Sequence, residues 1–421
     1  MLDDKQGTQR VMKNTLIRLA LASHLALAAH TAWAAEDVAT TTASLSPSTP
    51  WAEIEKQAYG QTVYFNAWGG SQEINDYLRW AGRQLKSQYG VNLKHVKVAD
   101  IAETSQRLLA EKTAGKNSGG SVDLVWINGE NFRSMKHSHL LYGPFVENLP
   151  NWQYVDKSLP IDRDFTEPTE GLEAPWGVGQ LVFIHDTETL KNPPHSFAEL
   201  LDVAKAHPGK ISYPQPPEFH GSSFLKAALL ELTDQPEELY KPIDSNTEQQ
   251  RFERVTAPLW AYLDQLHPVA WHKGQRFPSG TSETVQLLDD QQLLLAITFN
   301  PNAANAAIEQ GNLVETAQTY AFTQGALSNI HFLAIPWNAS AKAGALVAIN
   351  FLLSPEAQAR KADATLWGDP SVLTSETLAY TKKHNRNGKG TQGFSLYKAI
   401  PEPHPSWLTA IELEWQKRYG S

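Results

Sequence analysis

The chain has 421 residues, of which 41% are hydrophobic and 19% are charged, and its formal net charge is −9. A chain of this length can form two domains that each bury a core. The negative charge argues against binding to nucleic acid or to anionic membrane surfaces. The chain has no cysteine, which excludes disulfides, thiolate metal sites, a cysteine nucleophile and a lipid-modified cysteine.

The N-terminal 34 residues have the pattern of a signal peptide. A positively charged start precedes a short apolar run at residues 19–29, and Ala32-Trp33-Ala34 is a small-x-small cleavage site. The apolar run is too short to span a bilayer. We therefore expect cleavage before Ala35, export to the periplasm, and a leader over residues 35–60.

The first third of the mature chain alternates strand and helix patterns. Apolar runs bounded by turn residues predict strands at residues 62–67, 91–98 and 122–126. Apolar residues at helical spacing predict helices at residues 71–89 and 101–114. This order is typical of a parallel sheet covered by helices.

Residues 175–186, Pro-Trp-Gly-Val-Gly-Gln-Leu-Val-Phe-Ile-His-Asp, join a glycine-containing start to a buried apolar strand. We interpret this segment as the crossing between two α/β lobes, with a ligand cleft beside it. Lobe 1 is then expected over residues 61–176 and 325–421, and lobe 2 over residues 177–324.

The α/β rhythm continues after this crossing. Further strands are predicted at residues 210–213, 293–299 and 331–335. Further helices are predicted at residues 197–204, 224–232, 247–266 with an interruption at Pro258, 282–290, 301–310, 342–353, 355–364 and 406–419. Residues 368–398 are polar and irregular.

Polar and aromatic residues follow the predicted strands where open parallel sheets bind ligands. The candidates are Trp68, Gly70 and Ser71 after the first strand, Asn128, Glu130 and Asn131 after the third, Gly221, Ser222 and Ser223 at a helix start with free backbone N–H groups, and Asn300 after the 293–299 strand. Trp176, followed by Gly177, and Trp367 each lie beside a glycine and suit a stacking face. A turn, a helix cap or a core tryptophan explains each position equally well when it is taken alone.

Known catalytic patterns are missing from the sequence. There is no Gly-x-Ser-x-Gly elbow, no His-Glu-x-x-His pair and no phosphate-binding loop. The sequence therefore predicts no catalytic residue, no metal site and no cofactor.

Three segments resemble periplasmic solute-binding proteins of ABC importers, of the two-lobed type II class. They are Val122-Asp123-Leu124-Val125, residues 191–200, and the helical stretch 348–359 with its Ser354-Pro355-Glu356-Ala357-Gln358. The order of parts over nearly the whole mature chain is similar to the YnjB-type subgroup, which is itself similar to thiamine-, polyamine- and iron-binding members. The resemblance implies two Rossmann-like lobes with central mixed sheets joined by a two-strand hinge. It also implies ligand capture by hinge closure, without catalysis, and docking on a permease with its ATPase.

The resemblance also bears on the ligand. A thiamine-like or polyamine-like cation requires carboxylates and aromatic faces, and Glu130 and Glu173 are the acids best placed to supply the carboxylates. Trp367 falls where thiamine-binding relatives carry a late stacking tryptophan. The paired tyrosines of iron-binding members are not evident. We expect a monomer that meets the membrane only through the permease.

A secreted carbohydrate-binding or glycoside-cleaving protein is the alternative. Tryptophan platforms suit sugars, and Asp123 with Glu130 would be the carboxylate pair for hydrolysis. Asp123 begins a strand and Glu130 follows its other end, so the two are expected to point away from a common site. A periplasmic scaffold with a vestigial cleft is a weaker third hypothesis.

Overall fold

The computed structural model describes residues 45, 49–244, 246–384 and 396–420. The predicted signal peptide, its cleavage site before Ala35 and half of the predicted leader lie outside these residues. Within the leader, Trp51–Ala58 forms helix α1, because Ile54 and Ala58 are buried against the first core defined below. Among the described residues, no helix is both long enough and apolar enough to cross a membrane.

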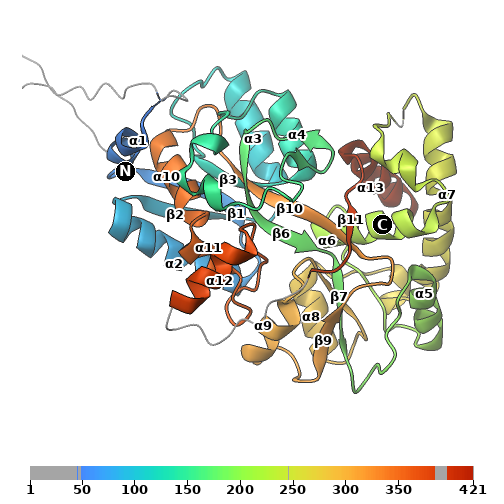
Figure 1. Ribbon diagram of the computed structural model, residues 1–421. Coiled ribbons are helices and arrows are strands. Elements are labelled where there is room, and N and C mark those ends of the chain that lie inside the picture. The colour runs from blue at the N-terminus through green and yellow to red at the C-terminus, as the bar shows by residue number, and fades with distance from the viewer. Residues whose placement is uncertain (1–44, 46–48, 245, 385–395, 421) are drawn as a thin grey trace, which may run out of the picture. The chain divides into compact units, whose positions relative to one another are not determined.

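The large sheet has six strands among the described residues, in the order β11-β10-β3-β1-β2, with β6 also paired to β10 (Figure 1). Its strands are β1 Thr62–Trp68, β2 Asn92–Val98, β3 Leu124–Ile127, β6 Glu173–Gln180, β10 Ala326–Ala334 and β11 Ala399–Pro401. Strand β1 is parallel to β2 and β3, whereas β10 is antiparallel to β3 and β6. The three strands predicted from the first third of the chain are confirmed, and the sheet is mixed as expected.

Helices pack on the large sheet because their apolar residues recur every three or four positions. In α2 (Gln72–Tyr89) the Ser71 hydroxyl accepts a hydrogen bond from the Ile74 backbone N–H at 3.3 Å, and Gly90 ends the helix with a φ of 69°. The other helices of this part are α3 Ala102–Thr113, α4 Gly129–His137, α10 Lys342–Leu352, α11 Pro355–Lys361 and α12 Ser375–His384. The first core, the apolar cluster of this sheet and its helices, includes Val63, Phe65, Leu78, Leu124, Phe132, Trp176, Phe332 and Ile349.

The small sheet has three antiparallel strands in the order β8-β7-β9. They are β7 Val182–Asp186, β8 Ala296–Thr298 and β9 Ala317–Tyr320. The helices of this part are α5 Phe197–Ala206, α6 Phe219–Leu232, α7 Gln249–Leu266, α8 Thr281–Asp289, α9 Ala303–Glu309 and α13 Pro405–Tyr419. The second core, the larger apolar cluster here, includes Phe183, Leu200, Phe224, Leu263, Ile297, Trp407 and Trp415.

Short elements complete the chain. Strands β4 Arg163–Asp164 and β5 Glu167–Pro168 form a two-stranded pair. The 3-10 helices are η1 Val146–Asn148, η2 Pro150–Tyr154, η3 Pro236–Tyr240, η4 His267–Val269 and η5 Trp271–Gly274.

Some predicted elements differ from the structure. Residues 210–213 form no strand, because Lys210 and Ile211 accept only single backbone hydrogen bonds, from Leu294 and Trp271. The predicted 293–299 strand is shortened to β8. Helix α7 continues through Pro258, because buried residues on both sides of the proline extend one packed face. The polar stretch 368–398, expected to be irregular, contains α12.

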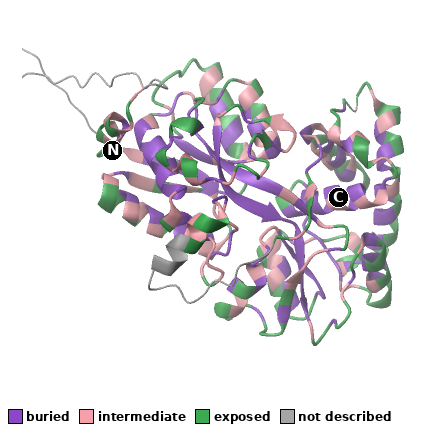
Figure 2. Cartoon of the chain, in the orientation of Figure 1, coloured by how far each residue is buried: buried purple, intermediate pink, exposed green. Residues whose placement is uncertain are grey.

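The chain passes between the two sheets at two places. Leu181 alone separates β6, which pairs with β10, from β7, which pairs with β8 and β9. The chain returns between β9 and β10. Both β6 and β7 are buried along their whole length (Figure 2). These two passages agree with the expected two-strand hinge.

The lobe boundaries at residues 176/177 and 324/325 stay a prediction. The apolar clusters change at the crossing, since Val178 belongs to the first core and Leu181 to the second. Helix α13, expected in lobe 1, packs into the second core through Trp407, Ile411 and Trp415. Its large apolar side chains therefore link the end of the chain to residues of the predicted lobe 2.

Candidate functional site

Helix α4 begins directly after β3 and carries the predicted site residue Glu130. Gly129 has a φ of 56°, and its backbone N–H donates to Asp164 Oδ2 at 2.5 Å. A side chain at this position would collide with the ring of Phe165, so glycine allows the helix to start against that ring. Asn128 caps α4 without a side-chain hydrogen bond, and its contact with a ligand stays a prediction.

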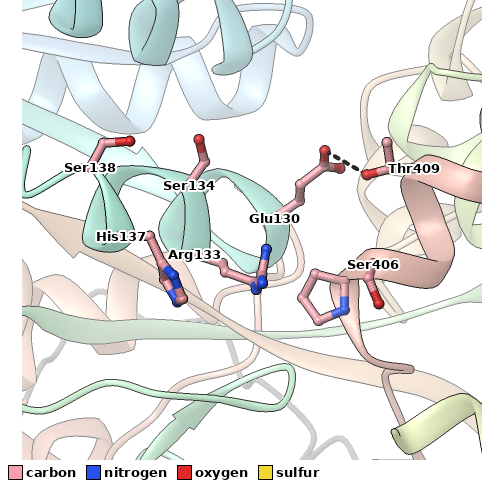
Figure 3. Close-up of a pocket in the computed structure, with 8 residues that line it drawn as sticks. Glu130, Arg133, Ser134, His137, Ser138, Ser406 and Thr409 are labelled. Carbon is pink, nitrogen blue, oxygen red and sulfur yellow. Dashed lines mark hydrogen bonds between the residues drawn. The ribbon is translucent and has the colours of Figure 1, made fainter. Parts of the chain in front are cut away.

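A cavity of about 330 Å³ separates α4 from α13 (Figure 3). It is lined by Glu130, Arg133, Ser134, His137, Ser138, Pro405, Ser406 and Thr409. At its edge the Thr409 hydroxyl donates to Glu130 Oε1 at 3.1 Å. Burial raises the pKa of Glu130, and this hydrogen bond opposes the increase. Because α4 packs in the first core and α13 in the second, the hydrogen bond between Thr409 and Glu130 connects elements of the two cores.

Helix α6 begins at Phe219, five residues before the predicted start. The Glu218 carboxylate accepts hydrogen bonds from the backbone N–H groups of His220 at 2.8 Å and Gly221 at 3.0 Å. The expectation of free N–H groups at Gly221 is therefore wrong, because the side chain of Glu218, the residue just before α6, caps the helix. A side chain at position 221 would collide with the carbonyl of Pro214, so this glycine serves close backbone packing.

Ser222 connects α6 to α13, since its hydroxyl donates to Glu412. Burial raises the pKa of Glu412 to about 7, and the negative charge of nearby Glu130 adds to the increase. The hydroxyl of Ser223 is buried and has no hydrogen-bond partner among the described residues. The structure therefore brings the predicted residues Glu130 and Ser222 to the same place, with Glu412 between them.

Lys226 lies one turn further along α6 and is only 2% exposed. Its Nζ donates to Glu402 at 2.7 Å, and the Asn329 side-chain amide donates to the other oxygen of that carboxylate at 2.9 Å. The same Nζ lies 4.8 Å from the ring centre of Phe165 and 5.9 Å from that of Phe219. Both distances are within the range of cation–π attraction.

We call the set Glu130, Asp164, Lys226, Glu402 and Glu412 the acidic junction. It gathers four carboxyl groups around one ammonium group. Burial raises the pKa of Asp164 well above its usual range, although the Gly129 hydrogen bond opposes this. Buried negative charge without a partner is unfavourable, so this arrangement is suited to receive a cation.

Glu173, the second acid expected to face a cation, lies at the start of β6 and is fully buried. Burial and the negative charge of Asp164 raise its pKa well above the usual range. Neither of its carboxyl oxygens has a hydrogen-bond partner among the described residues. Such surroundings disfavour the ionised carboxylate, so Glu173 is poorly placed to attract a cation.

The loop after β1 places Trp68, Gly70 and Ser71 together. A side chain at position 70 would collide with the Trp68 ring, so the glycine and the tryptophan pack on each other. Ser71 caps its own helix and donates to Glu73. The Ser282 hydroxyl of α8 donates to the Gly70 carbonyl at 3.3 Å, a second contact between parts of the two sheets.

Trp176 and Trp367 lie within the first core, and their rings are covered by protein in this structure. Their ring centres are 5.3 Å apart, and each also packs against Trp126. A side chain at Gly177 would collide with His331 and Asp369, which explains the glycine at this point of β6. The ligand contacts of Trp176, Gly177 and Trp367 stay predictions.

The two remaining predicted asparagines contact other parts of the chain. Asn131 Oδ1 accepts from the Ser105 hydroxyl at 3.5 Å. The Asn300 side chain donates to the carbonyl of Trp367 at 2.8 Å, and Asn302 donates to that of Gly368 at 2.6 Å. Asn300 therefore belongs with Trp367, in a group separate from the acidic junction.

Several residues of the acidic junction were missed by sequence reasoning. Lys226 could have been noticed in the sequence, because it is a single lysine within the apolar run Phe224–Leu230. Asp164 ends the two-residue strand β4, and Glu402 and Glu412 lie near the end of the chain. No local pattern relates these three acids to α4 or α6.

Asp123 and Glu130 do not form a catalytic pair. Asp123 is buried, and its two oxygens accept backbone hydrogen bonds from Ala341 at 2.8 Å and Tyr64 at 3.0 Å. Its carboxylate is therefore used by the fold. Among the described residues, no group of three or more histidine, aspartate or glutamate side chains is arranged to hold a metal ion.

The sequence matches the bacterial extracellular solute-binding protein family over residues 80–386. It is 46% identical over 371 residues to protein YnjB of Escherichia coli strain K12, an alignment that covers 88% of this chain and 94% of that protein.

Two solved structures show the same fold at low sequence identity. The periplasmic binding protein AfuA of Actinobacillus pleuropneumoniae, with fructose-6-phosphate bound, has a TM-score of 0.60 at 15% identity, covering 85% of this chain and 98% of that one. The spermidine/putrescine-binding protein PotD of Streptococcus pneumoniae has a TM-score of 0.56 at 14% identity, covering 86% and 100%.

Proposed function

The chain belongs to the family of bacterial extracellular solute-binding proteins, and we propose that it captures a small organic cation, thiamine-like or polyamine-like, at the acidic junction. It then delivers this ligand to the membrane permease and ATPase of an ABC importer. The observation that carries the proposal is the gathering of four carboxyl groups around one ammonium group. Two of these carboxyl groups, Glu130 and Glu412, come from helices of different cores.

Capture by closure requires a ligand that contacts both sides of the closing parts, because only such a ligand favours the closed state. Glu130 extends from α4 and Glu412 from α13, with Thr409 and Ser222 as neighbouring hydrogen-bond donors. A cation held between the two carboxylates would draw α4 and α13 together. The cavity beside Glu130 gives space for the rest of the ligand.

The charge of the acidic junction favours a cation over an anion among the ligands named for the similar structures. A sugar phosphate such as that in AfuA is an anion and would meet Glu130 and Glu412 as like charges. The polyamines named for PotD are cations and would neutralise them. Arg133, the cationic side chain that lines the cavity, lies 4.0 Å from Glu167, which offsets its charge.

The proposal has further parts, of which family membership supports export and ligand binding. The protein acts in the periplasm after cleavage before Ala35, as a monomer that binds its ligand without transforming it. The carbohydrate-cleaving alternative is not favoured, because Asp123 is held by backbone N–H groups away from Glu130. Its candidate acid pair is therefore absent.

Tryptophan fluorescence tests the proposal, since Trp68 and Trp126 lie near the loops of the large sheet. Titration with thiamine, putrescine and spermidine is expected to give a saturable change for at least one of them. Fructose-6-phosphate and glucose serve as controls that give none. A saturable response to the sugar phosphate, with none to any cation, would overturn the choice of ligand.

The affinity for the cation is expected to depend on pH, because the pKa of Glu412 is raised to about 7 in the ligand-free protein. A cation favours the ionised carboxylate, so binding strengthens as pH rises through about 7 and levels off above about 8. A permanently charged ligand should bind about tenfold more weakly at pH 6 than at pH 8, since each unit below the pKa costs about a factor of ten. Besides Ser222, the groups that influence Glu412 are Glu130, Lys226 and Asp100.

Calorimetric titration at several pH values measures this dependence. The variant Glu412→Gln is the control, because it removes the titrating group and should flatten the profile. An affinity that stays constant from pH 6 to 8 in the unaltered protein would contradict the assignment of Glu412 to the site.

A further inference from the structure

The ammonium group of Lys226 has the surroundings of a captured organic cation. It is almost completely buried, it pairs with the Glu402 carboxylate at 2.7 Å, and the Phe165 and Phe219 rings lie within 6 Å of it. Carboxylate and aromatic faces together are the groups that bind organic ammonium ions. A cation site of this kind therefore already exists in the chain, and a side chain fills it.

We propose that Lys226 is a built-in ammonium group that occupies one cation site of the acidic junction, so that the ligand binds through a single cationic centre at Glu130 and Glu412. Lys226 is then a specificity-determining residue, because it excludes a second ammonium group of the ligand. This inference rests on the proposed function and narrows its ligand class to molecules with one cationic centre, such as a thiamine-like cation.

Groups from several elements hold the Lys226 ammonium in place. Glu402 follows β11, and Asn329 on β10 fixes its second oxygen at 2.9 Å. Phe165 follows β4, and Phe219 is the first residue of α6. A residue needed only to fill the apolar helix α6 would not require a carboxylate, an amide and two rings around its end. The surroundings are built for a positive charge.

The carboxylates of the acidic junction that remain after Lys226 has paired with Glu402 favour the binding of one cation. Lys226 compensates Glu402, with which it forms the direct ion pair. Burial raises the pKa of Asp164 and so disfavours its ionised form, and its Oδ2 already accepts the Gly129 backbone N–H. Glu130 and Glu412 then remain, and their mutual repulsion favours a single shared positive centre.

Adding a free alkylammonium ion to a variant that lacks the Lys226 side chain tests whether position 226 is a cation site. Lys226→Ala removes the atoms of a propylammonium ion and is expected to lower the unfolding temperature by several degrees, since it leaves Glu402 buried without its partner. Propylammonium should recover at least half of this loss, whereas 1-propanol should not. Equal effects of the two compounds, or recovery by neither, would overturn the proposal. Lys86→Ala, at an exposed position of α2, is the matched control and should respond to neither compound.

Ligand selectivity gives a second measurement that uses the unaltered protein and so does not depend on the variant folding. The wild-type chain should bind butylammonium at least as tightly as putrescine. The Lys226 ammonium already occupies the site that the second ammonium group of putrescine would need. In Lys226→Ala this preference should shift toward putrescine by about tenfold or more. Tighter binding of putrescine by the wild-type chain would overturn the proposal.

These outcomes separate the two proposals. If propylammonium restores Lys226→Ala but the wild-type chain binds no organic cation, the cation site at Lys226 stands and the proposed function fails. If the wild-type chain binds cations but propylammonium acts no better than propanol, the proposed function stands and Lys226 is not a cation surrogate.

Discussion

Replacing both Glu130 and Glu412 with glutamine is expected to lower the affinity for the captured cation by about 100-fold or more. Each charged hydrogen-bonded contact contributes roughly 1.5–3 kcal/mol, and about 1.4 kcal/mol corresponds to a tenfold change. Each single substitution should therefore cost about tenfold or more. Glutamine keeps the length of the side chain and can still accept from Thr409 and Ser222, so the substitutions act mainly on charge. Calorimetric titration with the best-binding cation measures the effect.

The same substitutions are expected to stabilise the ligand-free protein. The folded-state pKa of Glu412 is about 7, above its ordinary value of 4.5. The folded state therefore binds the proton more tightly, and its stability falls as pH rises through about 7. At pH 8 glutamine removes this unfavourable ionisation, so the free energy of unfolding should rise while cation binding falls. Glu309→Gln, at the exposed end of α9, should change neither. A double variant that binds as tightly as the wild-type chain would contradict the proposed site.

The substitution Asp369→Asn is expected to lower the free energy of unfolding by about 3–5 kcal/mol, because it leaves Lys361 as a buried charge without its partner. Lys361 is fully buried, and its Nζ donates to the Asp369 carboxylate and to the Pro370 carbonyl at 3.0 Å. Burial opposes ionisation of Asp369, but His331 and Lys361 nevertheless hold its pKa below the usual range. The pair fixes residues 367–369, whose carbonyls at Trp367 and Gly368 accept hydrogen bonds from the loop after β8.

Urea unfolding followed by tryptophan fluorescence measures this loss. The double variant Lys361→Met, Asp369→Asn removes the buried charge and should recover much of it. Glu53→Gln breaks an exposed ion pair with Lys56 on α1 and should change stability by no more than about 0.5 kcal/mol. A loss below about 1 kcal/mol in Asp369→Asn would show that the buried pair does not stabilise this part of the fold.

Much of the fold could be predicted from the sequence, because periodicity and turn residues are local properties. The strands β1, β2 and β3 and the helix α2, with its Ser71 cap and Gly90 end, follow from runs of a few residues. The strand expected at 210–213 failed because its apolar residues serve the second core without a neighbouring strand. Helix α7 passes through Pro258 because packing on both sides outweighs one lost hydrogen bond.

The candidate site was predictable only where its residues directly follow a strand or open a helix. Glu130 and Ser222 satisfy that rule and lie at the acidic junction. Their partners Glu412 and Lys226 come from the C-terminal helix and from inside α6, and only tertiary packing brings them together. Trp176 follows the rule of a tryptophan beside glycine, but its ring is covered by Trp126 and Trp367. A local pattern cannot distinguish a ring that faces a ligand from one that faces the core.

Mass spectrometry of the small molecules that stay bound after the purified protein has been incubated with a cell extract tests the central claim most directly. We expect one organic cation with a single charged centre per chain, and its loss from the Glu130→Gln, Glu412→Gln double variant. A stoichiometric anion or neutral sugar, or a cation retained equally by the double variant, would contradict the account.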